Sequence, residues 1–497
     1  MKQMLVTADR ILTGFQDDGS PSIVEDAGLL IAGSRIEKIG NAGELRKAHP
    51  GVYEVGGRNQ VAIPGLINAH HHVGLTPFQM GARDQPLELW FPERLAMRDV
   101  DPRLDTLYAA FEMIASGVTT VQHLHSRAPG DVDAVIARAN RIIGAYTELG
   151  MRASYSFALR DQNRMIYEAD EVFVASLPTE LQAPTAAYLS GFGLPLEDQI
   201  SVFHALREQW AADPLIGIQI APSNLHWLSE AALESAALMA EETGAAVHMH
   251  LLETPYQAEY ARRRTGGSAL EHVDSFGLIG PNLTIGHGVW MTSDDLALLS
   301  ERGGCLCHNC SSNLRLKSGT ADLNAFLESG VPVALGIDEA GINDDRDMLQ
   351  EMRLALTLHR PSGHGAPAPS ADQILRMATE HGAATTPFAG HIGRLEIGGY
   401  ADIVLLDWTS VTSPYQNPAL PITDVLVRRA KPNAVETVII GGEVVLHGGQ
   451  FTNVDGAEVH AEIARTLNRS DTAEEARLRR LAADLIEPVR QFYKDWI

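Results

Sequence analysis

Cysteine is scarce in this sequence. Its three copies in 497 residues are Cys305, Cys307 and Cys310, so disulfides between distant segments are excluded. This usage is typical of a reducing compartment, and we predict a cytoplasmic protein. The C-x-C-x2-C spacing is similar to a zinc knuckle, but it falls on a predicted inner strand. Packing of small apolar thiols is therefore the favoured interpretation of this segment.

Positive charge and long apolar runs are also lacking. Lysine and arginine number 39 against 63 acidic residues, which gives a formal net charge of −24 at pH 7. Such a surface repels nucleic-acid backbones and anionic headgroups, so neither is an expected partner. No uncharged apolar run reaches the roughly 18 residues that a membrane span requires. The N-terminal segment has no continuous apolar core typical of a signal peptide. A small-molecule substrate is the expected partner.

The central part of the sequence alternates strand-like and helical runs. Buried strands at this spacing, each followed by a helix, predict a parallel sheet, and eight of them predict a (β/α)8 TIM barrel of the α/β class over residues 63–391. The expected strands cover residues 61–68, 118–124, 151–159, 216–223, 245–253, 283–289, 304–310 and 331–338.

Both ends of the chain have a different hydrophobic pattern, which predicts short strands joined by turns. Segments before residue 60 and after residue 390 show this pattern, including a hairpin turn at Gly441–Gly442. We expect residues 1–62 and 392–452 to form one small composite β-sandwich domain. Residues 453–497 are predicted to be a helical extension.

Histidines gather at the predicted ends of strands. In PGLINAHHHVG, His70 and His72 are two residues apart, so both point to one face while His71 points away. The segment AAVHMHLLE places His250 at a second strand end, with Glu253 three residues later. Catalytic groups of a barrel gather at these ends. A chance polar turn and a structural His–Glu hydrogen bond are the alternative interpretations.

Two further strand ends carry His287 in LTIGHGVW and Asp338 in VPVALGID. An ionised carboxylate at the end of a buried strand is costly unless it is paired or bound to a cation. Asp338 is thus a candidate fourth ligand beside the histidines, with turn capping as the alternative. Imidazole and carboxylate ligands suit Zn²⁺ best, with Fe²⁺ or Mn²⁺ as other possibilities.

These segments resemble the amidohydrolase superfamily over nearly the whole chain. The resemblance rests on PGLINAHHH, on HLLE, on GHGVW, on HNCSSNLRLKSG and on GIDEAGINDDRDMLQEMR. Within the superfamily the chain is most similar to the branch of cytosine, S-adenosylhomocysteine/methylthioadenosine and triazine deaminases and hydrolases. The segments DQPLELWFPE and RLEIGGYADIVLLD also resemble this branch.

The resemblance implies a role for each matched residue. Metal ligands would be His70, His72, His250 and Asp338, and Glu253 would carry the proton from water to the leaving nitrogen. His287 would hydrogen-bond the water or the developing oxyanion, beside Asp338. Binuclear relatives bridge two metals with a carbamylated lysine, but this chain has no lysine between Lys47 and Lys317. One divalent ion is therefore expected.

Two departures from this branch concern the substrate. Nucleoside-deaminase relatives carry a histidine where this chain has Ser223, with His226 shifted by three positions, and Glu339 replaces a glycine after the metal aspartate. Both changes put adenosine-type substrates in doubt and leave other aminated rings open. The candidate substrate-binding residues are Gln79, Trp90, His123, Tyr155, Asn224, His226, Glu339 and Asn343.

The predicted function is hydrolytic deamination of an amino-substituted N-heterocycle of pyrimidine, purine, pterin or triazine type. Alternatives are hydrolysis of a urea, carbamate or amide C–N bond, or removal of chloride or an alkylamine from a triazine. A non-catalytic scaffold on an enzyme fold is the alternative from another class. By analogy with relatives, we expect a homodimer or homotetramer.

Overall fold

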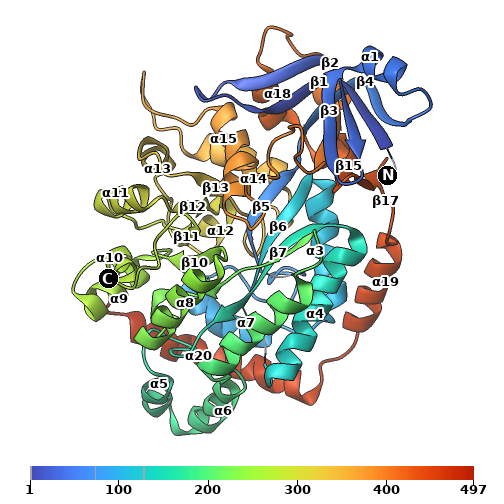
Figure 1. Ribbon diagram of the computed structural model, residues 1–497. Coiled ribbons are helices and arrows are strands. Elements are labelled where there is room, and N and C mark those ends of the chain that lie inside the picture. Colours follow the sequence, from blue (N-terminus) through green and yellow to red (C-terminus); the bar gives the residue numbers. More distant parts are fainter. Residues whose placement is uncertain (1–2, 73, 127–128) are drawn as a thin grey trace.

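The computed structural model describes residues 3–72, 74–126 and 129–497 (Figure 1). A sheet built from both chain ends lies at one end of the molecule, and a ring of parallel strands surrounded by helices makes up its centre. Among the described residues, no helix has the length and apolar character to cross a membrane.

Both chain ends contribute strands to one eight-stranded sheet. Its order is β17-β16-β15-β14-β4-β1-β2-β3, with β14 antiparallel to β4 at the join between the two chain ends. Side chains from both halves, such as Leu29 and Ile403, share one apolar core. The sequence predicts a sandwich of two sheets here, whereas the structure has one sheet. The strands are β1 (Gln3–Phe15), β2 (Pro21–Ala32), β3 (Arg35–Asn41), β4 (Tyr53–Pro64), β14 (Ile403–Asp407), β15 (Val435–Ile440), β16 (Glu443–His447) and β17 (Gln450–Phe451).

The central strands form two parallel sheets joined at both edges. One sheet has the order β5-β6-β7-β8 and the other β10-β11-β12-β13. Parallel bridges between Ile220 and Val247 and between His71 and Asp338 connect them, which closes the (β/α)8 barrel. The strands are β5 (Leu66–His71), β6 (Val118–His125), β7 (Arg152–Leu159), β8 (Ile216–Ile218), β9 (Ala221–Pro222), which pairs with β7, β10 (Val247–Leu251), β11 (Leu283–His287), β12 (Cys305–His308) and β13 (Val333–Leu335).

Helices connect the barrel strands and surround them (Figure 1). Their apolar sides join the strands in one large core. These helices are α3 (Pro102–Ala115), α4 (Val132–Leu149), α7 (Leu196–Trp210), α8 (Glu230–Thr243), α9 (Pro255–Thr265), α10 (Ala269–Ser275), α11 (Ser293–Arg302), α12 (Cys310–Arg315), α13 (Leu323–Glu328), α14 (Met348–Leu358), α15 (Ala371–Met377) and α16 (Glu380–Ala384). The remaining shorter helices are α1 (Ala42–Ala48), α17 (Trp408–Thr412) and α18 (Ile422–Arg429).

The first barrel strand begins later than the sequence predicts. The expected strand 61–68 is divided, because Val61–Pro64 completes β4 and the chain leaves that sheet at Gly65. A Cβ atom on Gly65 would lie 2.0 Å from the Thr119 hydroxyl oxygen, so the change of sheet requires a glycine. A continuous apolar run does not reveal such a change, because it is compatible with burial in either sheet.

Helices far apart in the sequence cover the end of the barrel opposite the terminal sheet (Figure 1). Buried residues of the loop after β7 and of the C-terminal helix, including Tyr167, Phe173, Leu485 and Tyr493, form one apolar cluster there. The C-terminal segment is helical, and its last helix packs against the barrel mouth. The elements concerned are α2 (Leu87–Glu93), α5 (Asp170–Ser176), α6 (Thr179–Ser190) and α20 (Ala473–Tyr493), while α19 (Gly456–Leu467) packs along the side of the barrel against α3.

A buried ion pair joins the barrel to the terminal sheet. The Arg152 guanidinium donates from Nε and Nη2 to the Asp402 carboxylate at 2.8 and 3.1 Å, and both side chains are almost fully buried. Removing one partner leaves the other charge uncompensated. We expect Asp402→Ala to lower the free energy of unfolding by about 3–5 kcal/mol, measured by chemical denaturation. Asp424→Ala, which breaks the exposed pair with Arg428, is the control and should cost less than about 1 kcal/mol. Equal losses in both variants would contradict this role.

Candidate active site

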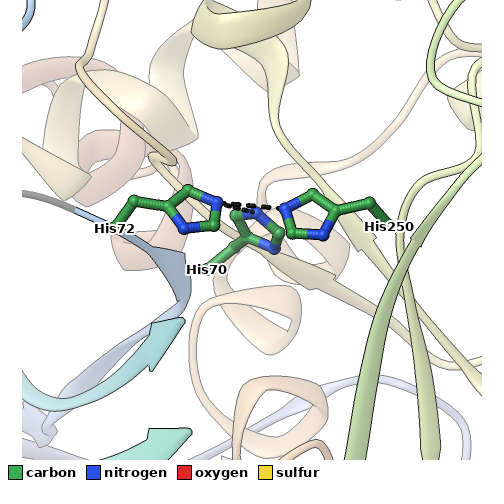
Figure 2. A group of neighbouring side chains, drawn as sticks. All are labelled: His70, His72 and His250. Atoms are coloured by element: carbon green, nitrogen blue, oxygen red, sulfur yellow. Dashed lines mark hydrogen bonds between the residues drawn. The ribbon is translucent and has the colours of Figure 1, made fainter. Parts of the chain in front are cut away.

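Three histidine side chains from two strands converge inside the barrel mouth (Figure 2). His70 lies near the end of β5, His72 directly follows that strand, and His250 lies near the end of β10. The Nε2 atom of His72 is 3.0 Å from the Nε2 atoms of both His70 and His250. The alternation of side chains along a strand explains why His70 and His72 share a face, and His71 faces His123 instead.

The hydrogen bonds of these rings leave lone pairs facing one another. His72 Nδ1 donates to the Leu124 carbonyl oxygen at 2.6 Å, and His250 Nδ1 donates to the Ser223 carbonyl oxygen at 2.8 Å. A neutral imidazole carries one N–H, so both Nε2 atoms present only lone pairs. Burial, reinforced by the neighbouring imidazoles, holds the pKa of His70 and His250 well below the ordinary value, which keeps these rings neutral. Facing lone pairs repel unless a cation lies between them, so these residues fit a metal ion.

Asp338 completes the cluster at the seam of the barrel. Its Oδ1 atom is 3.2 Å from His72 Nε2 and 3.6 Å from His70 Nε2. Its backbone has a positive φ of 64°, and its N–H donates to the His70 carbonyl at 2.8 Å, which holds this conformation. The Ser312 hydroxyl donates to Oδ2 at 2.6 Å and orients the carboxylate.

His287 and Glu253 lie beside this cluster. His287 Nε2 is 3.7 Å from Asp338 Oδ2, and His287 Nδ1 is 3.8 Å from Glu253 Oε1. Asn313 Oδ1 lies 2.9 Å from His287 Nδ1, so this nitrogen carries the proton. Burial raises the pKa of Glu253 to about 7, and the Ser318 hydroxyl donates to its carboxylate at 3.2 Å. A carboxyl group with a pKa near neutrality can both accept and return a proton.

A cavity opens onto this cluster, and several predicted substrate-binding residues line it. Trp90, Asn224 and Glu339 share the cavity with the histidines, Glu253 and Asp338, and its empty space is about 430 Å³. His123 lines an adjoining cavity with His72 and His125.

The structure does not bring the other predicted residues to these cavities. Gln79 is exposed and donates to Tyr108, and Asn343 is exposed and donates to Gln350. Tyr155 is fully buried and its hydroxyl contacts His125, while His226 stacks on Tyr167 with ring centroids 4.0 Å apart. The type and sequence position of these residues do not determine where their side chains point on a loop or in the core.

Other residues also line this cavity, and the sequence predicts no role for one of them, Arg94. Arg94 enters the cavity from the end of α2, with its guanidinium 3.6 Å from Glu339 and over the Trp90 ring. Phe91 and Trp227 line the same cavity, with ring centroids 5.3 Å apart. In the sequence, Arg94 belongs to no motif or spacing that would mark it as a site residue. The segment HNCSSN, which belongs to the family resemblance, includes Ser312 and Asn313. This motif therefore contained a signal for both residues.

Comparisons with known proteins agree with this geometry. The sequence profile of the Amidohydrolase family matches residues 61–445. A 5'-deoxyadenosine deaminase from Methanopyrus kandleri is 30% identical over 446 residues, which cover 88% of this chain and 93% of the relative. An adenosine deaminase structure from Xanthomonas campestris with bound zinc has a TM-score of 0.77 at 24% identity, covering 96% of this chain and 98% of that one. A triazine hydrolase from Arthrobacter aurescens has a TM-score of 0.80 at 21% identity, covering 94% and 99%.

Proposed function

Because the chain belongs to the amidohydrolase family, we propose that it is a metal-dependent hydrolase that deaminates an amino-substituted N-heterocycle. The observation that carries the proposal is the convergence of three imidazole Nε2 atoms and the Asp338 carboxylate at the mouth of the barrel. Glu253 and His287 complete the set of groups that hydrolysis needs.

The proposed ligands of one divalent ion are His70, His72, His250 and Asp338. Three imidazoles and one carboxylate favour Zn²⁺, with Fe²⁺ or Mn²⁺ as the other candidates. Such an ion supplies Lewis-acid chemistry and lowers the pKa of water from 15.7 to about 7.

The neighbouring side chains then perform the proton transfers. Glu253 accepts a proton from the attacking water and delivers it to the departing nitrogen, since its carboxylate lies beside His287 and its pKa is near neutrality. Asp338 and Nε2 of His287 accept hydrogen bonds from the attacking water and orient it. Ammonia leaves after a tetrahedral intermediate collapses.

The walls of the cavity suit a flat heteroaromatic ring. Phe91, Trp90 and Trp227 offer aromatic surface, and Arg94 with Glu339 offers a paired donor and acceptor at the same wall. The deaminase relative supports an aminated purine, whereas Ser223 and Glu339 depart from nucleoside deaminases. We therefore propose the class of aminated purine, pyrimidine, pterin or triazine rings.

A screen for ammonia release tests this function. The purified zinc-loaded protein is incubated with adenosine-type nucleosides, cytosine, guanine, aminopterins and aminotriazines. We expect ammonia from at least one ring at a rate at least 100-fold above that of the matched Glu253→Gln protein. Release of chloride or an alkylamine from a triazine, or cleavage of a urea or amide without ring deamination, would support the alternative chemistry instead. Well under one ion per chain after supplementation, with no turnover, would favour a scaffold.

We also propose a compartment and an assembly for this protein. Cys305, Cys307 and Cys310 are free thiols, in keeping with a cytoplasmic protein. A homodimer or homotetramer stays a prediction from analogy with relatives.

A further inference from the structure

A second cluster of metal-binding side chains lies behind the active site, between β12 and α14. His308 is the last residue of β12, Cys310 is the first residue of α12, and His359 directly follows α14. All three side chains are buried, with exposed fractions of 1%, 0% and 6%. The sequence favours simple packing for all three cysteines, but only Cys310 lies beside two histidines in this way.

The reactive atoms of these three residues point at one another. Nε2 of His308 is 2.9 Å from Nε2 of His359 and 2.7 Å from Sγ of Cys310, and Sγ is 3.7 Å from Nε2 of His359. This mutual approach of two imidazole nitrogens and a thiol sulfur is the donor set of a transition-metal site.

Hydrogen bonding alone does not satisfy the cluster. Within the described residues, Nδ1 of His308 is buried without a partner. If the proton of this ring is on Nδ1, a buried N–H is left without a partner. If the proton is on Nε2, it can be donated well to only one of the two neighbours that approach this atom. A cation bound by the two Nε2 atoms and Sγ would replace the crowded contacts among these three atoms, with the His308 proton on Nδ1.

We propose that His308, Cys310 and His359 bind a second transition-metal ion, Zn²⁺ by preference, at a site separate from the catalytic cluster. Two imidazoles and a thiolate supply three ligands, and water can fill the fourth position of a tetrahedron. Ideal Zn–N and Zn–S bonds place ligand nitrogens about 3.4 Å apart and nitrogen and sulfur about 3.6 Å apart. The observed distances reach these values with movements below about 1 Å.

A neighbouring acidic side chain can balance the positive charge of such an ion. Binding of Zn²⁺ converts the Cys310 thiol to a thiolate, releases one proton to solvent and leaves one net positive charge. Glu351 is buried beside this segment and accepts from the Ser311 backbone N–H at 3.0 Å. Its carboxylate opposes that charge.

The proposed site would stabilise a segment whose residues position active-site side chains. Asn309 lies between His308 and Cys310, and its amide contacts the His287 ring at 3.3 Å. Ser312 follows Cys310 by two residues and orients Asp338. An ion on the far side of this segment would therefore fix the residues that position the catalytic groups, without touching the substrate.

Cobalt substitution tests the site because a thiolate bound to Co²⁺ gives an intense near-ultraviolet charge-transfer band. The proposed catalytic ligands include no thiolate, so the band reports on this cluster alone. We expect the band in the Co²⁺-loaded wild-type protein and in Cys307→Ser, the matched control for a buried cysteine. It should be absent from Cys310→Ser and His359→Ala, while His250→Ala should retain it. Bound zinc should fall from about two ions per chain to about one in Cys310→Ser.

Two outcomes would overturn the proposal. One is a wild-type protein that binds one ion per chain and shows no thiolate band. The other is a band that persists in Cys310→Ser or disappears in Cys307→Ser. If Cys310→Ser misfolds, as judged by circular dichroism, His359→Gln decides between the outcomes because it keeps the thiol and the size of the side chain. Loss of deaminase activity in His250→Ala with the band retained would separate this site from the catalytic one.

Discussion

Glu253→Gln is expected to lower turnover by between about 100-fold and 10,000-fold while leaving the fold and the bound ion in place. The amide has nearly the same shape, but it cannot accept a proton from water or return it to the leaving nitrogen. Glu253 contacts His287, Ser318 and Gln257 and is not among the proposed ligands. Steady-state kinetics with metal analysis on the same sample measures both parts of the expectation.

The control for this variant is Glu259→Gln, a residue of α9 that lies outside the cavity. Glu259 pairs with Arg262 and Arg263 away from the cavity, so turnover should change by less than about twofold. A near-wild-type rate for Glu253→Gln would refute its role in proton transfer.

The same assay, repeated across a range of pH, tests the ionisation of Glu253. Burial raises the pKa of Glu253 to about 7, and the active base is deprotonated, so activity should fall as the pH drops through and below this value. A bound divalent ion favours the carboxylate and moves this limb to lower pH.

Removal of the proposed catalytic ion is expected to cause the second large loss of turnover. His72 is central to the cluster, because its Nε2 atom is the one that approaches His70, His250 and Asp338 together. We expect His72→Ala to lower turnover by at least about 1,000-fold, which exceeds the 10–100-fold loss typical of residues that only orient a ligand. Bound metal should decrease in the same sample, as measured by elemental analysis.

Metal removal should also lower stability, because an ion that binds only the folded chain stabilises it. At an ion concentration 1,000 times the dissociation constant, this contribution is about 4 kcal/mol. Chelated protein should therefore unfold at lower denaturant concentration and recover when zinc is restored. His364→Ala, in an exposed loop, should change neither activity nor metal content. Unchanged metal content in His72→Ala would contradict the proposed ligand set.

Much of the architecture could be predicted because its signals are local. The alternation of buried strands and helices predicts the barrel, and the spacing of His70 and His72 places both on one face. The beginning of the first barrel strand shows the limit of such signals. Val61–Pro64 and Leu66–His71 form one apolar run in the sequence, yet Gly65 divides them between two sheets.

The structure places some of the candidate substrate-binding residues at the cavity and others away from it. Trp90, Asn224 and Glu339 line the cavity, whereas Gln79 and Asn343 are exposed on loops and Tyr155 is enclosed in the core. The position of a side chain at the end of a strand follows from the strand itself. The direction of a loop side chain depends on the neighbours that pack against it.

The sequence by itself determined the family, the strand–helix alternation and the residue types gathered at the strand ends, because periodicity and motif spacing are properties of neighbouring residues. Only the tertiary structure decided which side chains share a cavity, and that Cys310 lies with His308 and His359. His359 is 49 residues away from Cys310 along the chain. Packing of α14 against α12, which depends on the closure of the whole barrel, brings them into contact.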